Sequence, residues 1–485
     1  MKKISLVLVV IILAVSVGLG IALVQKELDV QKGKGDKEIP FTNYEVDYFD
    51  EATRVDSKNG IRINFNEETT FNTVVLKESG DVIREFSLFY MDKEGNDKFI
   101  YKQDLVEGYR YCSFPTISTT SLYVEIKGVE GEAWNINDIE IYYMGDTYDK
   151  DFRVTAYVVS QYTYKKSSVE REHFKAITHV NLISTVFFTQ EGDIYFLDSY
   201  IDGVLIDGKT IFETSLANIK EVIEPNTTIV ATLLGQDKNG SGLGQREIHN
   251  TAFTTYKDNF IKNALEFKEK YNLDGLSFDY EYPETMEEYA VMFEACRTLK
   301  EQMSPGSLMT VALGTWSIYK PLIFDKTLME CVDWVESMNY DEMREDPHNY
   351  HSTFSTSCYD FIENIRLVNN SFGEKAKGIY TDLKDVNLGL PFYSRPTDGR
   401  GYWGNYVDVA ESLGKYTNVK FDEYYQGQLL PPTYYNSYQM IYDKVCYCID
   451  QGMGGVMVWH YSCDAPWDSG LSLWRAIYEA VESRK

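Results

Sequence analysis

The chain has 485 residues, a formal net charge of −27 and 44% hydrophobic residues. So acidic a chain argues against nucleic acid and anionic membrane surfaces as partners, because both bind basic patches. The apolar content is ample for packed cores, and the length suggests two or three domains.

The first segment has the pattern of an export signal. Lys2 and Lys3 precede a charge-free, mostly apolar run from Ile4 to Val24. Such a run is long enough to cross a bilayer, which takes about 20 residues. We interpret residues 1–25 as a signal peptide or an N-terminal membrane anchor and residues 26–40 as a flexible linker. Either interpretation predicts that the rest of the chain is extracellular or at the cell surface, with no other membrane contact.

Short strands separated by turn residues fill residues 41–146 and predict an all-β sandwich domain. The runs Phe71–Gly80 and Ile83–Tyr90 resemble the galactose-binding-like (discoidin-type) sandwich that often accompanies secreted glycosidases. This resemblance leaves two roles open, a binding site for a second glycan and a structural spacer. We expect the domain to fold independently of the residues that follow it.

From residue 151 to residue 485 strands alternate with helices. The candidate strands are Val154–Gln161, Val180–Phe188, Thr228–Gly235, Gly275–Glu281, Leu308–Trp316, Trp334–Asp341, Leu388–Arg395 and Gly455–Tyr461. Eight such repeats predict an α/β fold of the (β/α)8 or TIM-barrel type. Functional side chains then belong at the carboxyl ends of the strands.

The stretch from Asp274 to Pro283 carries paired carboxylates. In a strand, Ser277, Asp279 and Glu281 share one face, and the two acids lie roughly 6.5–7 Å apart along it. An acidic inner face destabilises a sheet that helices cover on both sides, so it favours a functional role. Two carboxyl groups this close shift each other's pKa when buried, as acid–base chemistry requires.

This stretch resembles the signature of glycoside hydrolase family 18, Asp-x-x-Asp-x-Asp-x-Glu. Asp274, Asp279 and Glu281 match its first Asp, last Asp and Glu, whereas Ser277 replaces the middle Asp and Tyr280 the usual Trp. Three later strand ends resemble further family motifs in the same order, namely Met338–Asp341, Gly389–Arg395 and Gly454–His460. The stretch from Pro396 to Tyr435 falls where many members carry a small α+β insertion.

The resemblance implies a chitinase-like glycosidase that cleaves β-linked N-acetylglucosamine (GlcNAc) glycans by substrate-assisted, retaining catalysis. It makes Glu281 the acid/base, and Asp279 the stabiliser of the oxazolinium ion formed from the substrate's acetamide. Tyr340 would bind the acetamide oxygen, and Trp459 would lie under the −1 sugar. The remaining substrate-binding positions that it implies are Asp341, Met338, Tyr393, Arg395 and Tyr157. Asp274 and Ser277 support the signature, and Ser277 can donate a hydrogen bond but cannot share negative charge.

Several functions stay open at this point. Chitin or chito-oligosaccharides are the first choice of substrate, and an endo-β-N-acetylglucosaminidase acting on peptidoglycan or N-glycans is the alternative. A third reading is a non-hydrolytic chitinase-like glycan-binding protein, which the presence of Glu281 disfavours. The sequence has no zinc-protease, phosphate-loop or dinucleotide motif, so we expect no metal and no cofactor. We expect a monomer whose partner is a GlcNAc-containing polysaccharide or oligosaccharide.

Overall fold

The structure of the protein is a computed structural model. It describes residues 46–128, 132–238, 240, 242–314, 330–341, 351–371, 383–396, 404–420, 423–425, 428–430 and 433–485. The expected signal or anchor segment and the linker lie outside the described residues. Within them, no helix is both long and apolar enough to span a bilayer, and no three His, Cys, Asp or Glu side chains gather as ligands for a metal ion.

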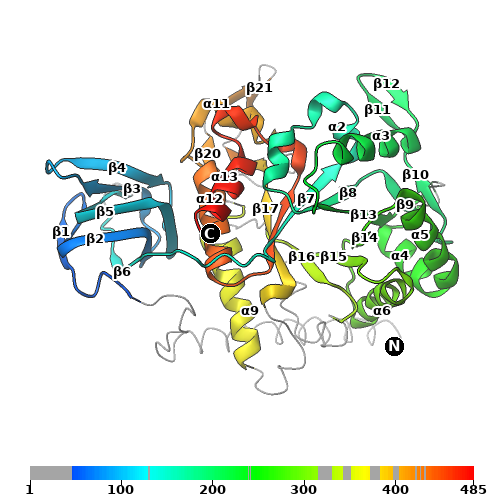
Figure 1. The fold of residues 1–485 in the computed structure, drawn as a ribbon, viewed down its shortest axis with the longest axis horizontal. Helices are drawn as coiled ribbons and strands as arrows, with labels where there is room; N and C mark the ends of the chain where they lie inside the picture. Colours follow the sequence, from blue (N-terminus) through cyan, green and yellow to red (C-terminus); the bar gives the residue numbers. More distant parts are fainter. Residues whose placement is uncertain are drawn as a thin grey trace, which may run out of the picture. The chain divides into compact units, whose positions relative to one another are not determined.

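Eight parallel strands close into a barrel (Figure 1). They are β7 (Arg153–Val159), β8 (His179–Ile183), β13 (Thr228–Gly235), β14 (Gly275–Asp279), β15 (Leu308–Gly314), β16 (Trp334–Met338), β17 (Val386–Pro391) and β24 (Gly455–Trp459). Each strand pairs in parallel with the next, and β24 pairs with β7 to close the ring. The predicted (β/α)8 barrel is therefore confirmed.

Two of the predicted strand boundaries are wrong in ways that bear on the site. The expected strand Val180–Phe188 is broken at Ser184, whose φ of 67° interrupts the extended backbone, and it continues as β9 (Val186–Phe188). The strand expected to reach Glu281 ends at Asp279. Glu281 is therefore in the loop after the strand, where its side chain is exposed.

Helices follow the strands and pack on the outside of the barrel. They are α3 (Gly208–Lys220), α4 (Gln245–Thr254), α5 (Lys257–Tyr271), α6 (Met286–Gln302), α9 (Asp360–Ser371), α12 (Tyr438–Asp450) and α13 (Leu473–Glu482). Helix α6 begins at the predicted capping box. Thr285 Oγ1 accepts from the Glu288 amide, and the Glu288 carboxylate accepts from the Thr285 amide. Its fixed start places the loop of Glu281 directly before a rigid helix.

The described parts of the chain between β17 and α12 form the expected small α+β insertion. Its elements are β18 (Tyr393–Pro396), β19 (Gly404–Asn405), α11 (Val407–Leu413), β20 (Val419–Lys420), β21 (Glu423–Tyr425), β22 (Gln428–Leu430) and β23 (Thr433–Tyr434). The first strand of the insertion carries Tyr393 and Arg395, so the insertion supplies one side of the carboxyl end of the barrel.

The N-terminal region is antiparallel. Its strands are β1 (Thr53–Ser57), β2 (Gly60–Glu78), β3 (Ile83–Met91), β4 (Asp97–Gln103), β5 (Tyr109–Gly128) and β6 (Ile136–Tyr142). The long strands β2 and β5 pair with each other through register shifts, and all six strands join one hydrogen-bonded sheet. Side chains from both halves of the long strands, such as Ile63 and Leu76, share one hydrophobic core. The likeness to galactose-binding-like sandwiches stays a prediction.

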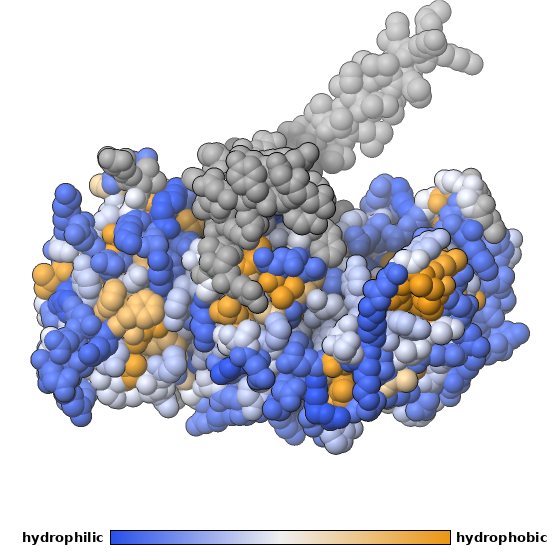
Figure 2. Space-filling view, turned by 90° about the horizontal axis from the view of Figure 1, so that it is seen from above, coloured by the Kyte–Doolittle hydropathy of each residue, from blue (hydrophilic) through white to orange (hydrophobic). Residues whose placement is uncertain are grey.

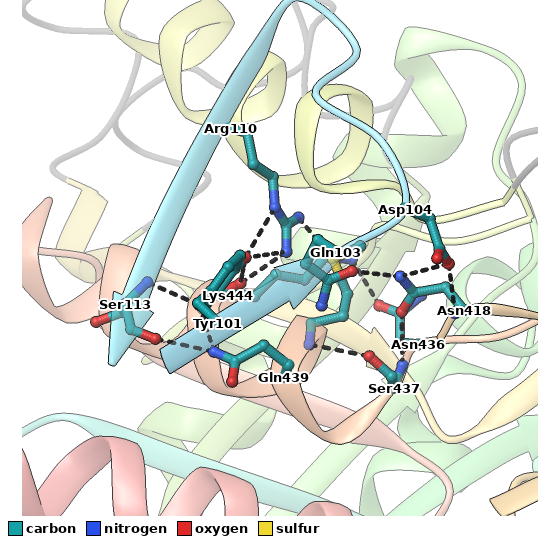
Figure 3. Close-up of polar contacts among 12 residues, drawn as sticks. Tyr101, Gln103, Asp104, Arg110, Ser113, Asn418, Asn436, Ser437, Gln439 and Lys444 are labelled. Atoms are coloured by element: carbon teal, nitrogen blue, oxygen red, sulfur yellow. Dashed lines mark hydrogen bonds and ion pairs between the residues drawn. The ribbon is translucent and has the colours of Figure 1, made fainter. Parts of the chain in front are cut away.

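Helix α12 links the N-terminal strands to the barrel, within a compact unit that spans Glu45–Lys485. All of its residues are buried. The buried Asp443 on this helix accepts hydrogen bonds at 2.6 Å from both Arg110 Nη2 and the Tyr101 hydroxyl. Gln439 Nε2 donates to the Ser113 carbonyl at 2.9 Å (Figure 3). The interface is thus ionic and buried, unlike that of a loosely tethered module.

Hydrophilic residues dominate one face of the molecule. The face seen in Figure 2 is largely hydrophilic, and its hydrophobic residues are gathered in a few separate patches. All seven cysteines are buried and free of disulfides.

Candidate active site

The carboxyl end of β14 brings two acids to the mouth of the barrel. Asp279 is the last residue of the strand and is 6% exposed, and Glu281 follows in the loop. Ser277 is fully buried on the same inward face, as the strand alternation predicts. Asp274 is at the other end of the strand, where its carboxylate accepts a hydrogen bond from the Ile229 amide at 2.7 Å. Asp274 therefore fixes the start of β14 against β13 and lies away from the two acids.

A cavity of about 180 Å³ surrounds the two acids. All nine residues predicted for catalysis and substrate binding line it, as do three residues that sequence reasoning missed, Tyr282, Ala312 and Met457. Tyr282 and Met457 belong to the matched motifs, so their positions were open to prediction. Ala312 lies in the middle of an ordinary apolar strand, and no sequence signal marks it.

The pKa of the Asp279 carboxyl is raised well above its usual value, first because the group is buried and second because of the charge of Glu281. Its Oδ1 atom has no hydrogen-bond partner among the described residues. Gln245 holds the backbone of this segment, because its side-chain oxygen accepts from the Glu281 amide at 3.2 Å and its side-chain nitrogen donates to the Asp279 carbonyl at 3.5 Å. Burial and the neighbouring charge thus both favour the protonated form of Asp279, next to the solvent-exposed Glu281.

A second set of polar groups follows β16. Arg395 binds the Asp341 carboxylate with two atoms, Nε to Oδ1 at 2.6 Å and Nη2 to Oδ2 at 2.7 Å. The Tyr393 hydroxyl donates to the same Oδ1 at 2.9 Å. Burial raises the pKa of Asp341, but the hydrogen bonds and charge of Arg395 outweigh it and keep this pKa below its ordinary value. The result is a fixed carboxylate beside Tyr340, whose ring lies edge-on to Tyr393 at 5.8 Å.

Aromatic and sulfur-containing side chains form the apolar part of the cavity. Trp459 ends β24, and its ring lies 5.9 Å from that of Tyr157. Met338, Ala312 and Met457 pack in the same cluster. Trp459 is partly buried in this cluster and lines the cavity, and an indole face of this kind suits the apolar face of a sugar ring.

Ser277, which replaces the middle Asp of the signature, is close to Tyr157. Burial raises the pKa of the Tyr157 phenol well above its usual value, as do the charges of Glu336 and Asp279, whereas the side chains of Ser277 and Asn181 lower it. Ser277 is therefore a neighbour of Tyr157, although neither hydroxyl oxygen has a well-aligned hydrogen-bond partner among the described residues. The peptide bonds Glu281–Tyr282 and Trp459–His460, on either side of the cavity, are cis.

Comparison with known proteins identifies the family to which the chain is similar. The family model of glycosyl hydrolases family 18 matches residues 153–464, well over half of the chain. Chitinase A1 of Niallia circulans is 24% identical over 258 residues, which cover 42% of this chain and 37% of that protein. Nod factor hydrolase protein 1 of Medicago truncatula is 23% identical over 212 residues, or 39% of this chain and 51% of that protein. The chain thus spans about half or less of these two relatives.

Solved structures share the fold at low identity. The GH18 chitinase ChiB from the chitin utilization locus of Flavobacterium johnsoniae matches with a TM-score of 0.51 and 20% identity, covering 69% of this chain and 94% of that chain. Catalytic domain 2 of the Group II chitinase of Ostrinia furnacalis matches with a TM-score of 0.50 and 15% identity, covering 69% and 98%.

Proposed function

The chain belongs to family 18 of the glycosyl hydrolases, and on that basis we propose that it hydrolyses β-linked GlcNAc glycans, with chitin or chito-oligosaccharides as the first choice. The observation that carries the proposal is the acid pair, with Asp279 buried and Glu281 exposed in one cavity. A carboxyl group that donates a proton to a leaving oxygen must be reachable by the substrate, and Glu281 is.

The reaction proceeds in two displacements. Glu281 protonates the glycosidic oxygen while the acetamide oxygen of the −1 sugar attacks its C1 carbon, which gives an oxazolinium ion and the free leaving group. Glu281, now a carboxylate, then takes a proton from a water molecule that attacks C1 and reopens the ring. The two substitutions at C1 each invert its configuration, so the product keeps the β configuration.

Asp279 supplies the balancing charge in this scheme. Because Asp279 is buried beside Glu281, its pKa is raised and its carboxyl group holds a proton more readily than an ordinary Asp does. When that proton is on Glu281, Asp279 is the negative group that accepts from the acetamide N–H and stabilises the oxazolinium cation. Tyr340 donates to the acetamide oxygen, held in place by the ring of Tyr393.

The rest of the cavity orients the sugar. Trp459 provides the floor of the −1 position, with Tyr157, Met338 and Met457 behind it. Asp341, fixed by Arg395, is available to the hydroxyl groups of the bound sugar. Fixed groups of this kind reduce the entropy that is lost in reaching a reactive geometry.

A comparison of two fluorogenic disaccharides tests the proposal. The protein should release methylumbelliferone from the β-chitobioside and leave the β-cellobioside, which lacks the acetamide, essentially uncleaved. Binding of GlcNAc oligosaccharides without any hydrolysis would replace the proposal with that of a glycan-binding protein. A panel that adds peptidoglycan and N-glycans decides between a chitinase and an endo-β-N-acetylglucosaminidase.

A further inference from the structure

The end of β4 and the turn that leads to β5 contact the insertion of the barrel. The backbone amide of Asn418, directly before β20, donates to Asp104 Oδ2 at 2.6 Å. The side-chain nitrogen of Asn418 donates to Gln103 Oε1 at 2.5 Å and to Asp104 Oδ2 at 3.3 Å (Figure 3). Phe99 of β4 lies edge-on to Tyr416, with ring centroids 5.4 Å apart. The N-terminal region therefore holds the insertion by polar and aromatic contacts.

Asn418 is at the centre of this contact. It is 1% exposed, and its other polar atoms bond to the far end of the insertion. Its side-chain oxygen accepts from the Ser437 amide at 3.0 Å, and its carbonyl accepts from the Tyr435 amide at 2.8 Å. Ser437 is the N-cap of α12. One buried side chain thus joins the N-terminal region, the insertion and the start of α12, and a fully bonded group of this kind makes its surroundings rigid.

A ladder of short strands connects Asn418 to the catalytic cavity. Val419, the next residue, pairs with Tyr434 of β23, which in turn pairs with Arg395 of β18. Arg395 holds the Asp341 carboxylate in the cavity with two hydrogen bonds. The strands β18, β20 and β23 have only two to four residues each, at or below the lower limit of strands in globular proteins. The position of Arg395 therefore depends on what holds this ladder from outside.

Side-chain packing gives a second connection between the same two places. Tyr434 is 1% exposed and packs against Leu105 of the turn after β4. Its ring also lies edge-on to that of His351, with centroids 6.0 Å apart. His351 is fully buried, its ring is 5.3 Å from that of Tyr393, and its Nδ1 atom is 3.9 Å from Asp341 Oδ1. Leu105 thus supports the groups behind the Asp341 carboxylate.

We propose that the segment Gln103–Leu105 of the N-terminal region is a positioning element of the catalytic cavity. Through Asn418 and Tyr434 it holds the insertion so that Arg395 keeps Asp341 in the orientation that binds the sugar. A pair with two parallel hydrogen bonds needs both atoms in place, so a small shift of β18 weakens it. This inference rests on the proposed function and deepens it, because it gives the N-terminal region a part in substrate binding without touching the substrate.

The first test removes the side chain of Asn418. Asn418→Ala loses the side-chain bonds to Gln103, Asp104 and Ser437. The kcat/KM for the methylumbelliferyl β-chitobioside should fall about 2- to 10-fold, which is the worth of one weakened hydrogen bond to the sugar. The fall should come mainly from a higher KM, because the lost interaction acts on the bound substrate as well as on the transition state. An unchanged kcat/KM in a folded variant would overturn the inference.

Two further variants separate positioning from a general loosening of the interface. Gln439→Ala is the matched control, because the side-chain nitrogen of Gln439 donates to Ser113 and Asp443 rather than to the insertion. It should leave kcat/KM unchanged, and a fall equal to that of Asn418→Ala would contradict the proposal. Asp104→Asn keeps the shape of the side chain and removes only its charge, so it tests the same contact if Asn418→Ala does not fold. It should lower kcat/KM in the same direction, by less.

A double-mutant cycle tests whether the effect passes through Arg395. In the Arg395→Met background, Asn418→Ala should cause no further loss of kcat/KM. Additive losses would mean that Asn418 acts elsewhere, and would refute the proposal.

Amide hydrogen exchange in β18 and β23 gives a measurement that needs no activity. Exchange there should be faster in Asn418→Ala than in the wild type or in Gln439→Ala, because the ladder opens more often. Equal exchange in all three proteins would overturn the inference while the proposed function stands. If the wild type cleaves no GlcNAc glycan, the proposed function fails, and hydrogen exchange alone decides whether the N-terminal region positions this wall.

Discussion

Replacing Arg110 with Met tests whether the N-terminal domain is a fixed part of the catalytic unit. Arg110 is 1% exposed in β5, and its partner Asp443 is fully buried in α12. The guanidinium donates to Asp443 Oδ2 at 2.6 Å and to the Tyr101 hydroxyl at 3.0 Å. Removal of one partner from a buried ion pair costs about 3–5 kcal/mol of unfolding free energy, since it leaves a desolvated charge. Asp443 keeps hydrogen bonds from Tyr101, Ser113 and Gln439, so we expect the lower end, about 3 kcal/mol.

The loss should also depend on pH. Burial raises the pKa of Asp443 to about 6, even though Arg110 lowers it. Without Arg110 this pKa rises further, so the folded variant keeps a proton that the unfolded chain releases above about pH 4. Because the folded state then binds more protons, its stability falls as pH rises. The variant should be more strongly destabilised at pH 8 than at pH 5.

Urea unfolding followed by tryptophan fluorescence measures both effects. Arg84→Met is the control, because Arg84 is in β3 of the same sheet and its ion pair with Asp81, in the preceding turn, is partly exposed, at 27% and 47%. That pair should contribute less than about 1 kcal/mol. The double variant Arg110→Met/Asp443→Leu should recover most of the loss. A cost for Arg110→Met as small as that of the control would refute the reasoning. The same contacts argue against the expected independent folding, so a barrel that lacks residues 1–146 should be less stable than the full chain.

Three further substitutions address the candidate site. Glu281→Gln should lower kcat by about 100- to 10,000-fold with little change in the Kd for chitotriose, since only proton transfer is lost; near-normal turnover would assign the acid elsewhere. Asp279→Asn should abolish most activity yet raise the melting temperature at pH 7. Burial and Glu281 raise the pKa of Asp279, so the ionised carboxylate destabilises the fold increasingly as pH rises above about 4, and a neutral amide removes that loss of stability. A lower melting temperature at pH 7 would contradict this. Trp459→Ala should raise KM and lower kcat, each by about 10-fold, and unchanged steady-state kinetics would make Trp459 a packing residue only.

The barrel and the members of the site could be read from the sequence because both leave local patterns. The strands β13 and β14 are apolar runs between amphipathic helices, and the residues of the cavity, apart from Tyr157 and Ala312, fall in four motifs in chain order. The strand ends could not be read as well, because the pattern that predicts a strand continues into the loop of Glu281. The break at Ser184 depends on the left-handed backbone conformation of that single residue, which a serine in the sequence does not predict.

Contacts between distant segments were not predictable. Arg110 and Asp443 are 333 positions apart, and each lies in a stretch that reads as a half-exposed strand or an amphipathic helix. Only the packing of β5 against α12 buries both charges and makes them a pair.

The anomeric form of the first product tests the central claim most directly. In the proposed reaction the substrate's own acetamide attacks C1 first and water attacks it second. The configuration at C1 is inverted twice, so the sugar is released in the β form. Proton NMR of chitotetraose at early times, before mutarotation, should show the β-anomer signal growing first and relaxing to the equilibrium mixture. Initial release of the α anomer would contradict the account, because it requires a single direct attack by water and gives the acetamide no part in the chemistry.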